Sequence, residues 1–217
     1  MGFLLKFLLS SLCNYWIWHT FHNNLFFCLW GIFLSLFILK FNGSTTAGLL
    51  VVLISIFFVA IFFLQTSPKL IFDLSDLEIY TINERRSYYS RRFIGQFLEN
   101  KPLYIFSKWQ KNVFESLDIN NYFFASHPRE RLGISEYKKF PFIYLPVFLF
   151  GLFQIIKKKH AFLFLYPVGS ILFIPIFKEI GESLFILFPW FVFILFEGFG
   201  GLFTFLITYL NNVKNQE

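Results

Sequence analysis

Residues 183–210 read SLFILFPWFVFILFEGFGGLFTFLITYL, and this apolar stretch decides the fold class. As a single helix it would be about 42 Å long, whereas the hydrocarbon core of a bilayer is about 30 Å thick. Glu197 is its only acidic residue and Pro189 its only proline. We therefore expect a membrane helix that Pro189 kinks and that residues 197–201, EGFGG, end or break.

Shorter apolar runs on the N-terminal side of this stretch predict further membrane helices at residues 3–19, 25–41, 47–65, 141–156 and 161–177. The sequence thus predicts an all-α polytopic membrane protein with about six transmembrane helices. Lys6 and Asn14 interrupt the first run. The alternatives for that run are an amphipathic helix lying in the membrane interface and a secretory signal peptide, although its Trp and His content and the missing small-residue cleavage site argue against cleavage.

The composition of the whole chain supports this fold class. Its 217 residues are 56% hydrophobic and 15% charged, against about 25% charged residues in an average soluble domain. These values exclude an intrinsically disordered chain. The chain contains 36 phenylalanines, and we expect them to face lipid. No nucleic-acid-binding motif accompanies the net charge of +6, so no nucleic-acid partner is expected.

The charged residues divide the chain into three regions. Residues 66–140 hold nine of the thirteen acids and twelve of the nineteen bases, and they form the one sizeable water-facing region. Residues 1–65 and 141–217 on either side are expected to hold about three spans each. Within the water-facing region, residues 97–117 carry an apolar side chain at every third or fourth position. This spacing predicts an amphipathic helix on the membrane surface.

Orientation is predicted from short basic loops. Lys157, Lys158 and Lys159 lie between two apolar runs, and such short loops stay in the cytoplasm. Residues 66–140 would then face outward from the plasma membrane, and both termini would be cytoplasmic. Lys138 and Lys139, at the other end of the same predicted span, favour the opposite orientation.

Three acids near the start of the water-facing region are candidate catalytic residues. Asp73, Asp76 and Glu78 precede two pairs of arginines. One of these carboxylates could act as a general base or bind a divalent cation beside a sugar donor, and no other cofactor is expected. The alternative is that they form the solvated face of an amphipathic helix.

Residues 118–140, DINNYFFASHPRERLGISEYKKF, contain a second candidate site directly before the next membrane helix. The side chains of His127, Arg129 and Arg131 are suited to binding the phosphate of a lipid carrier. Alternatively the arginines contact bulk headgroups or pair with Glu130 and Glu136.

Glu197 is the candidate polar residue within a span, since an ionisable group in a membrane helix often marks a functional position. The neighbouring glycines leave open a position at the membrane interface instead. We find no metal-ligand spacing, glycine-rich phosphate loop or nucleophile elbow in the sequence.

The stretch from Leu117 to Ile156 resembles bacterial GT-C membrane glycosyltransferases of the protein-mannosyltransferase-like family. It combines the Tyr-Phe-Phe and His-Pro-Arg-Glu-Arg motifs with PFIYLPVFLFGLFQII and the basic residues that follow. The resemblance implies a protein that handles a polyprenyl-phosphate-linked sugar at the outer face of the membrane. That family places its catalytic acid in the first outward loop, whereas residues 20–24 of this chain contain no acid. The chain thus resembles the C-terminal part of such an enzyme.

Two hypotheses for function follow. In the first, Arg129 and Arg131 bind the carrier phosphate, and one of the acids Asp73, Asp76 or Glu78 lies near the acceptor. In the second, the chain is a non-enzymatic membrane subunit or scaffold that binds a protein partner through residues 66–140. Membrane lipids are partners in both. A transporter ranks third, because apart from Glu197 the predicted spans contain almost no polar side chains.

Overall fold

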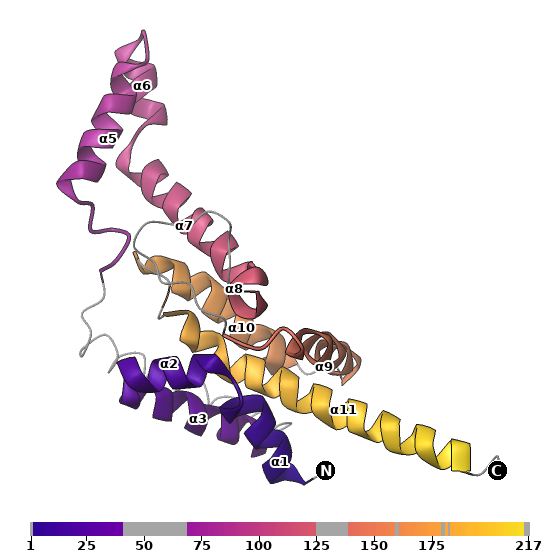
Figure 1. Ribbon diagram of the computed structural model, residues 1–217. Coiled ribbons are helices and arrows are strands. Elements are labelled where there is room, and N and C mark those ends of the chain that lie inside the picture. The colour runs from indigo at the N-terminus through magenta and orange to yellow at the C-terminus, as the bar shows by residue number, and fades with distance from the viewer. Residues whose placement is uncertain are drawn as a thin grey trace.

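The computed structural model describes residues 2–40, 69–124, 139–158, 161–178, 181 and 183–214, and every regular element in them is helical (Figure 1). An antiparallel bridge joins Leu70 to Phe177. The predicted all-α class is therefore confirmed. The predicted span at 47–65 lies outside the described residues, as do His127, Arg129 and Arg131.

The N-terminal apolar run is two helical segments rather than one span. Helix α1 (Phe3–Phe7) continues into the π-helix η1 (Leu8–Leu12), and α2 (Tyr15–Asn23) begins after a break. The break arises because the backbone N–H of Ile17 donates to Asn14 Oδ1 at 2.9 Å, which caps a new helix. Asn24 caps the next helix, α3 (Leu25–Lys40), in the same way. The predicted second run is thus confirmed as a helix.

Residues 76–123 form an arm of four helices, whose first two helices extend from the rest of the molecule and whose last helix contributes Tyr122 and Phe123 to the core (Figure 1). The predicted amphipathic helix corresponds to α7 and begins later than expected, because Asn100 Oδ1 accepts from the backbone N–H of Leu103 at 2.8 Å. The four helices are α5 (Asp76–Ser87), α6 (Arg92–Leu98), α7 (Lys101–Leu117) and α8 (Asn120–Phe123).

The C-terminal elements end in one long helix. The predicted break at residues 197–201 is wrong, because α11 (Phe188–Lys214) runs through them without interruption. Pro189 lies in the first turn of α11, where a proline is tolerated, instead of kinking its middle. The preceding elements are α9 (Tyr144–Lys158), α10 (Ala161–Phe173) and the short 3₁₀ turns η2 (Ile174–Ile176) and η3 (Ser183–Leu187).

Glycines at 151 and 198 allow α9 and α11 to touch backbone to backbone. A Cβ on Gly151 would fall inside contact distance of the Ile194 carbonyl oxygen, and one on Gly198 inside that of the Val147 carbonyl oxygen. Figure 1 shows α9 nearly end-on while α11 lies in the plane of the view, so the two helices cross steeply. Gly198, which we expected to end or break α11, therefore allows α9 and α11 to cross in close contact.

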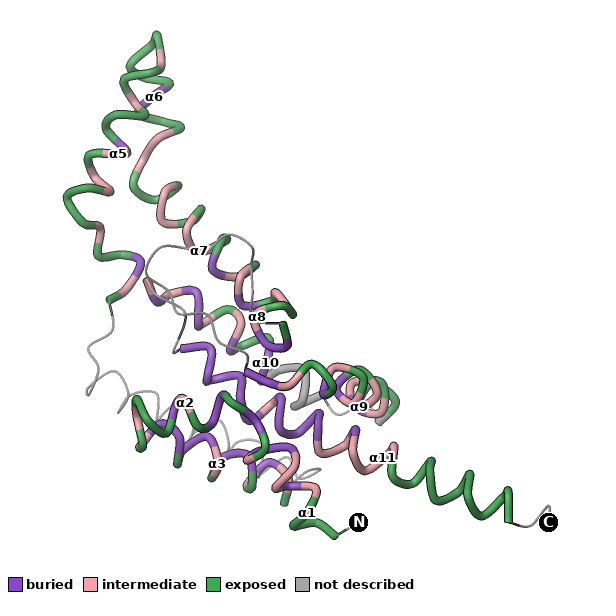
Figure 2. Tube along the Cα trace, viewed as in Figure 1, coloured by how far each residue is buried: buried purple, intermediate pink, exposed green. Residues whose placement is uncertain are grey.

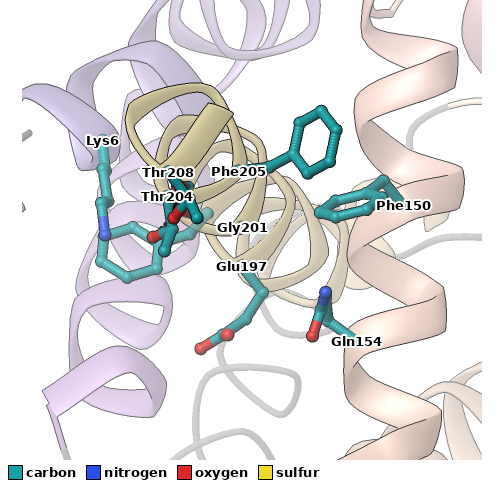
Figure 3. A pocket seen from close by; sticks show the side chains of 10 residues that line it. Lys6, Phe150, Gln154, Glu197, Gly201, Thr204, Phe205 and Thr208 are labelled. Atoms are coloured by element: carbon teal, nitrogen blue, oxygen red, sulfur yellow. Dashed lines mark hydrogen bonds between the residues drawn. The ribbon is translucent and has the colours of Figure 1, made fainter. Parts of the chain in front are cut away.

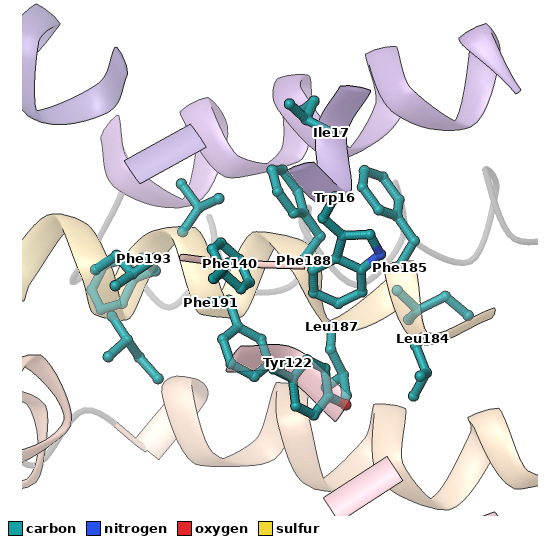
Figure 4. Close-up of a cluster of buried hydrophobic side chains, with 14 of the residues drawn as sticks. Trp16, Ile17, Tyr122, Phe140, Leu184, Phe185, Leu187, Phe188, Phe191 and Phe193 are labelled. Carbon is teal, nitrogen blue, oxygen red and sulfur yellow. The ribbon is translucent and has the colours of Figure 1, made fainter. Parts of the chain in front are cut away.

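Aromatic side chains from four parts of the chain form the centre of the core (Figure 4). The indole of Trp16 on α2 is 1% exposed. Rings of α8, of the segment before α9, and of η3 and α11 surround it with centroids 5.6–6.0 Å away, namely Tyr122, Phe140, Phe185, Phe188 and Phe191. Many phenylalanines therefore pack against one another within the chain, contrary to the expectation that they face lipid.

Burial changes along α11 (Figure 2). Its first eight residues are buried except Trp190, which is half-buried, whereas residues 203–214 are exposed on every side. Among the described residues, one helical stretch, Ser183–Lys214, is long and apolar enough to cross a membrane, with a mean hydropathy of 2.0. Shorter apolar helices accompany it at Phe3–Leu12, Leu25–Lys40, Tyr144–Lys157 and Tyr166–Ile176.

Candidate functional site

Glu78 lies at the base of the arm, where three segments meet. As the third residue of α5 it forms a capping box with Ser75, whose backbone N–H and hydroxyl donate to Glu78 Oε2 at 2.8 and 3.0 Å. Lys108 of α7 donates to Oε1, and Lys178, after η2, donates to Oε2 at 2.8 Å. The Glu78 side chain is 12% exposed, so one carboxylate holds two lysines in a mostly buried position.

Hydrogen bonds from the two lysines keep the Glu78 carboxyl ionised. Burial alone would raise the pKa of Glu78, but the hydrogen bonds from Lys108, Lys178 and Ser75 outweigh it and lower the pKa from 4.5 to about 2. Glu78 is therefore a carboxylate at neutral pH, with both oxygens bound.

Further hydrogen bonds join the same three segments. The N–H of Lys178 donates to the Lys69 carbonyl at 2.8 Å, and that of Ile71 donates to the Ile176 carbonyl at 2.9 Å. Asn112 of α7 donates its side-chain amide to the Phe177 carbonyl at 2.9 Å and to the Pro175 carbonyl at 3.3 Å. The arm is thus attached to residues 175–178 both through α7 and through residues 69–71, which precede α5.

The other two predicted acids lie nearby and are exposed. Asp73 Oδ2 accepts from the Leu70 N–H at 3.4 Å, and the Asp73 carbonyl accepts from Lys178 Nζ at 3.3 Å. Asp76 is the first residue of α5. The structure therefore brings Asp73 and Glu78 to one lysine, and it gives Glu78 the role of an anchor. A catalytic role for any of the three stays a prediction.

The described residues on either side of the second predicted site are firmly held. Tyr122 is buried, and its backbone carbonyl accepts from the N–H of Phe140 at 2.8 Å. Lys139 is also buried, with Nζ 2.6 Å from the Asn121 carbonyl and 5.8 Å from the centre of the Trp16 ring. Lys139, predicted as an orientation signal, therefore contributes to the core. The role of His127, Arg129 and Arg131 in phosphate binding stays a prediction.

Glu197 lies in the middle of α11 and is half-buried in a groove of about 540 Å³. Figure 3 shows Lys6 of α1 on one side of α11 and Phe150 and Gln154 of α9 on the other. The ammonium of Lys6 lies 5.4 Å from the centre of the Phe196 ring. Because the helix does not end at Gly198, the explanation of Glu197 as a helix-end residue is wrong.

Lys108 and Lys178 are the site residues that sequence reasoning missed. The Ser75-Asp-Leu-Glu78 spacing of a capping box was a signal for the start of α5. No local pattern could have paired Glu78 with lysines 30 and 100 residues away.

Within the described ranges, no group of three or more His, Cys, Asp or Glu side chains is arranged to hold a metal ion. Comparison of the chain with protein-family models, curated proteins and solved structures yields no match.

Proposed function

We propose that this protein is a non-enzymatic, multi-pass membrane subunit whose arm binds a protein partner. The observation that carries the proposal is the pair of lysines that donate to Glu78. Because both oxygens of this carboxylate are bound to cations, it serves to attach the arm to the bundle. The length and hydropathy of Ser183–Lys214 support a position in the membrane. The shorter apolar helices, of which α3 is the longest, accompany it in the bilayer.

The partner surface in this proposal is the outer face of α7. Its apolar side chains at positions 103, 106, 114 and 117 are exposed, whereas Asn112 and Ser116 face inward and are buried. Phe106 is stacked on Trp109, with ring centroids 5.9 Å apart. A rigid helix with an uncovered aromatic and aliphatic face is suited to an apolar groove or helix on another protein.

Site-specific photo-crosslinking in intact membranes tests the proposal. Replacing Phe106 or Phe114 with a benzophenone amino acid is expected to give a protein adduct of one discrete mass. The same replacement at Asn83, on the exposed polar part of α5, serves as the control and is expected to give none. Adducts with lipid alone at positions 106 and 114 would overturn the partner assignment.

The glycosyltransferase that the resemblance implies stays a prediction, and it can be tested on the purified protein. Transfer of sugar from a polyprenyl-phosphate donor, lost in Asp73→Asn or Asp76→Asn, would replace our proposal with that activity. Loss of donor binding in a variant with Arg129 and Arg131 changed to Ala would support it independently.

The six-span arrangement with cytoplasmic termini also stays a prediction. Cysteine substitutions at Ser90 and at His160, labelled from one side of the membrane, test it. The predicted orientation requires Ser90 to be outside and His160 inside, so labelling at position 160 from outside would show that it is wrong.

A further inference from the structure

The far end of the arm points sideways from the bundle. In Figure 1, α5 runs across the direction of α11, and α6 lies at the end of the arm farthest from the other helices. Figure 2 shows this end almost entirely exposed. If α11 crosses a bilayer, as the proposed function states, a helix that runs across its direction extends over the lipid surface beside the bundle.

Apolar side chains of α6 face outward at this end. Phe93 is 77% exposed and Phe97 is 66% exposed. The opposite side of the short helix is fixed by Gly95, where a Cβ would lie 2.8 Å from the Arg86 carbonyl oxygen. Because only a glycine permits this approach, α6 is packed against the end of α5 with Phe93 and Phe97 turned away from the arm.

Three exposed arginines, Arg85, Arg91 and Arg92, accompany these rings. The fourth arginine is used internally, since Arg86 Nε donates to the Glu99 carbonyl at 2.6 Å. The two acids at this end accept hydrogen bonds within the arm. The hydroxyls of Tyr88 and Tyr89 donate to the carboxylates of residues 84 and 99 at 3.0 and 3.4 Å. The end of the arm therefore presents positive charge beside aromatic rings.

We propose that the end of the arm binds the anionic headgroups of the bilayer that holds the bundle. The guanidinium groups of Arg85, Arg91 and Arg92 would bind lipid phosphates, and Phe93 and Phe97 would enter the headgroup and upper acyl region. An anionic lipid surface attracts each of these arginines, whereas a neutral surface gives no comparable attraction. This inference rests on the membrane position in the proposed function, and its test distinguishes the two.

The experiment uses the full chain reconstituted in vesicles, with an environment-sensitive fluorophore attached through Phe93→Cys in a Cys13→Ser background. Cys28 is 1% exposed and is retained, and protein without the Phe93 change gives the labelling background. Quenching by brominated lipids is measured in phosphatidylcholine with and without phosphatidylglycerol. A label attached through Tyr209→Cys, on the exposed part of α11, reports whether the bundle is in the bilayer.

We expect quenching at position 93 to be stronger with phosphatidylglycerol and to fall when salt is raised. The variant with Arg85, Arg91 and Arg92 changed to Gln is expected to lose this difference. The matched control removes the same charge from exposed lysines away from the end of the arm, with Lys69, Lys111 and Lys214 changed to Gln, and is expected to keep it.

Three results would overturn the inference in different ways. Quenching at position 209 with none at position 93 would leave the bundle in the membrane and remove the arm from the lipid surface. Absence of quenching at both positions would overturn the membrane position as well. Equal quenching at position 93 in both lipids, unaffected by the arginine changes, would show that anionic headgroups are not recognised.

Discussion

Lys178 Nζ lies 2.8 Å from Glu78 Oε2, although the two residues are 100 positions apart in the sequence. The contact joins the first turn of α5 to the segment that follows η2. Since Lys108 of α7 reaches the other oxygen of Glu78, the same carboxylate fixes both long helices of the arm to the bundle.

Glu78→Gln is expected to destabilise the protein by about 1–3 kcal/mol, because two mostly buried lysines lose their counter-charge. Glutamine can still accept from Ser75, so the capping box is retained. Thermal unfolding in detergent measures the effect. Glu84→Gln changes an exposed acid of the same helix and is expected to alter stability by less than about 0.5 kcal/mol. Equal effects of the two changes would contradict the anchor role.

The contribution of Glu78 is expected to depend on pH. Its pKa is about 2 in the folded protein against an ordinary value of 4.5, so the unfolded chain binds the proton more readily. The stabilisation is complete above about pH 5 and is lost as the pH falls towards 2. The difference in melting temperature between wild type and Glu78→Gln should therefore narrow on acidification. A difference that stays constant between about pH 7 and pH 3 would show that the pKa is not lowered.

Gly198→Ala is expected to cost about 1–3 kcal/mol, because the added methyl group meets the Val147 carbonyl and forces α9 away from α11. Gly169→Ala is the matched control. A Cβ there meets nothing within 4 Å, and alanine favours the helix by up to about 1 kcal/mol. Denaturation with sodium dodecyl sulfate compares the two variants. The crossing is wrong if Gly198→Ala is as stable as Gly169→Ala.

Trp16→Ala is expected to cost about 3–5 kcal/mol, since it leaves a cavity among the aromatic rings of the core. Trp18→Ala, on the exposed side of the same helix, is expected to cost about 1 kcal/mol or less, chiefly the hydrogen bond from its indole to the Leu12 carbonyl. Unfolding midpoints of the two variants under one condition give the comparison, and a smaller loss for Trp16→Ala would place that indole outside the core.

Local sequence patterns predicted where the helices occur better than they predicted where each helix begins and ends or which segments pack against it. The apolar run beginning at Leu25 and the amphipathic spacing of α7 were sufficient to find both helices. The glycines around Glu197 were misleading, because propensity treats Gly198 as a helix breaker and only the approach of Val147 shows why it is there. The steep crossing of α9 and α11 likewise could not be predicted from hydropathy, because hydropathy carries no information on the direction of a helix.

The candidate site shows the same limit. Sequence reasoning selected Asp73 and Glu78 and the structure brings both to Lys178, but the pattern of acids alone could not distinguish catalysis from attachment. That distinction required the lysines, which come from distant parts of the chain. The burial of Lys139 beside Trp16 was equally hidden, because a basic residue next to an apolar run is usually an interfacial one.

The stability of the exposed end of α11 depends on the solvent that surrounds it. Residues 203–214 span about 18 Å and are exposed, and an isolated helix of that length is marginal in water. Its backbone hydrogen bonds persist where water is excluded and open where water competes for them. Amide exchange along these residues would therefore map the depth to which the apolar environment reaches along the helix.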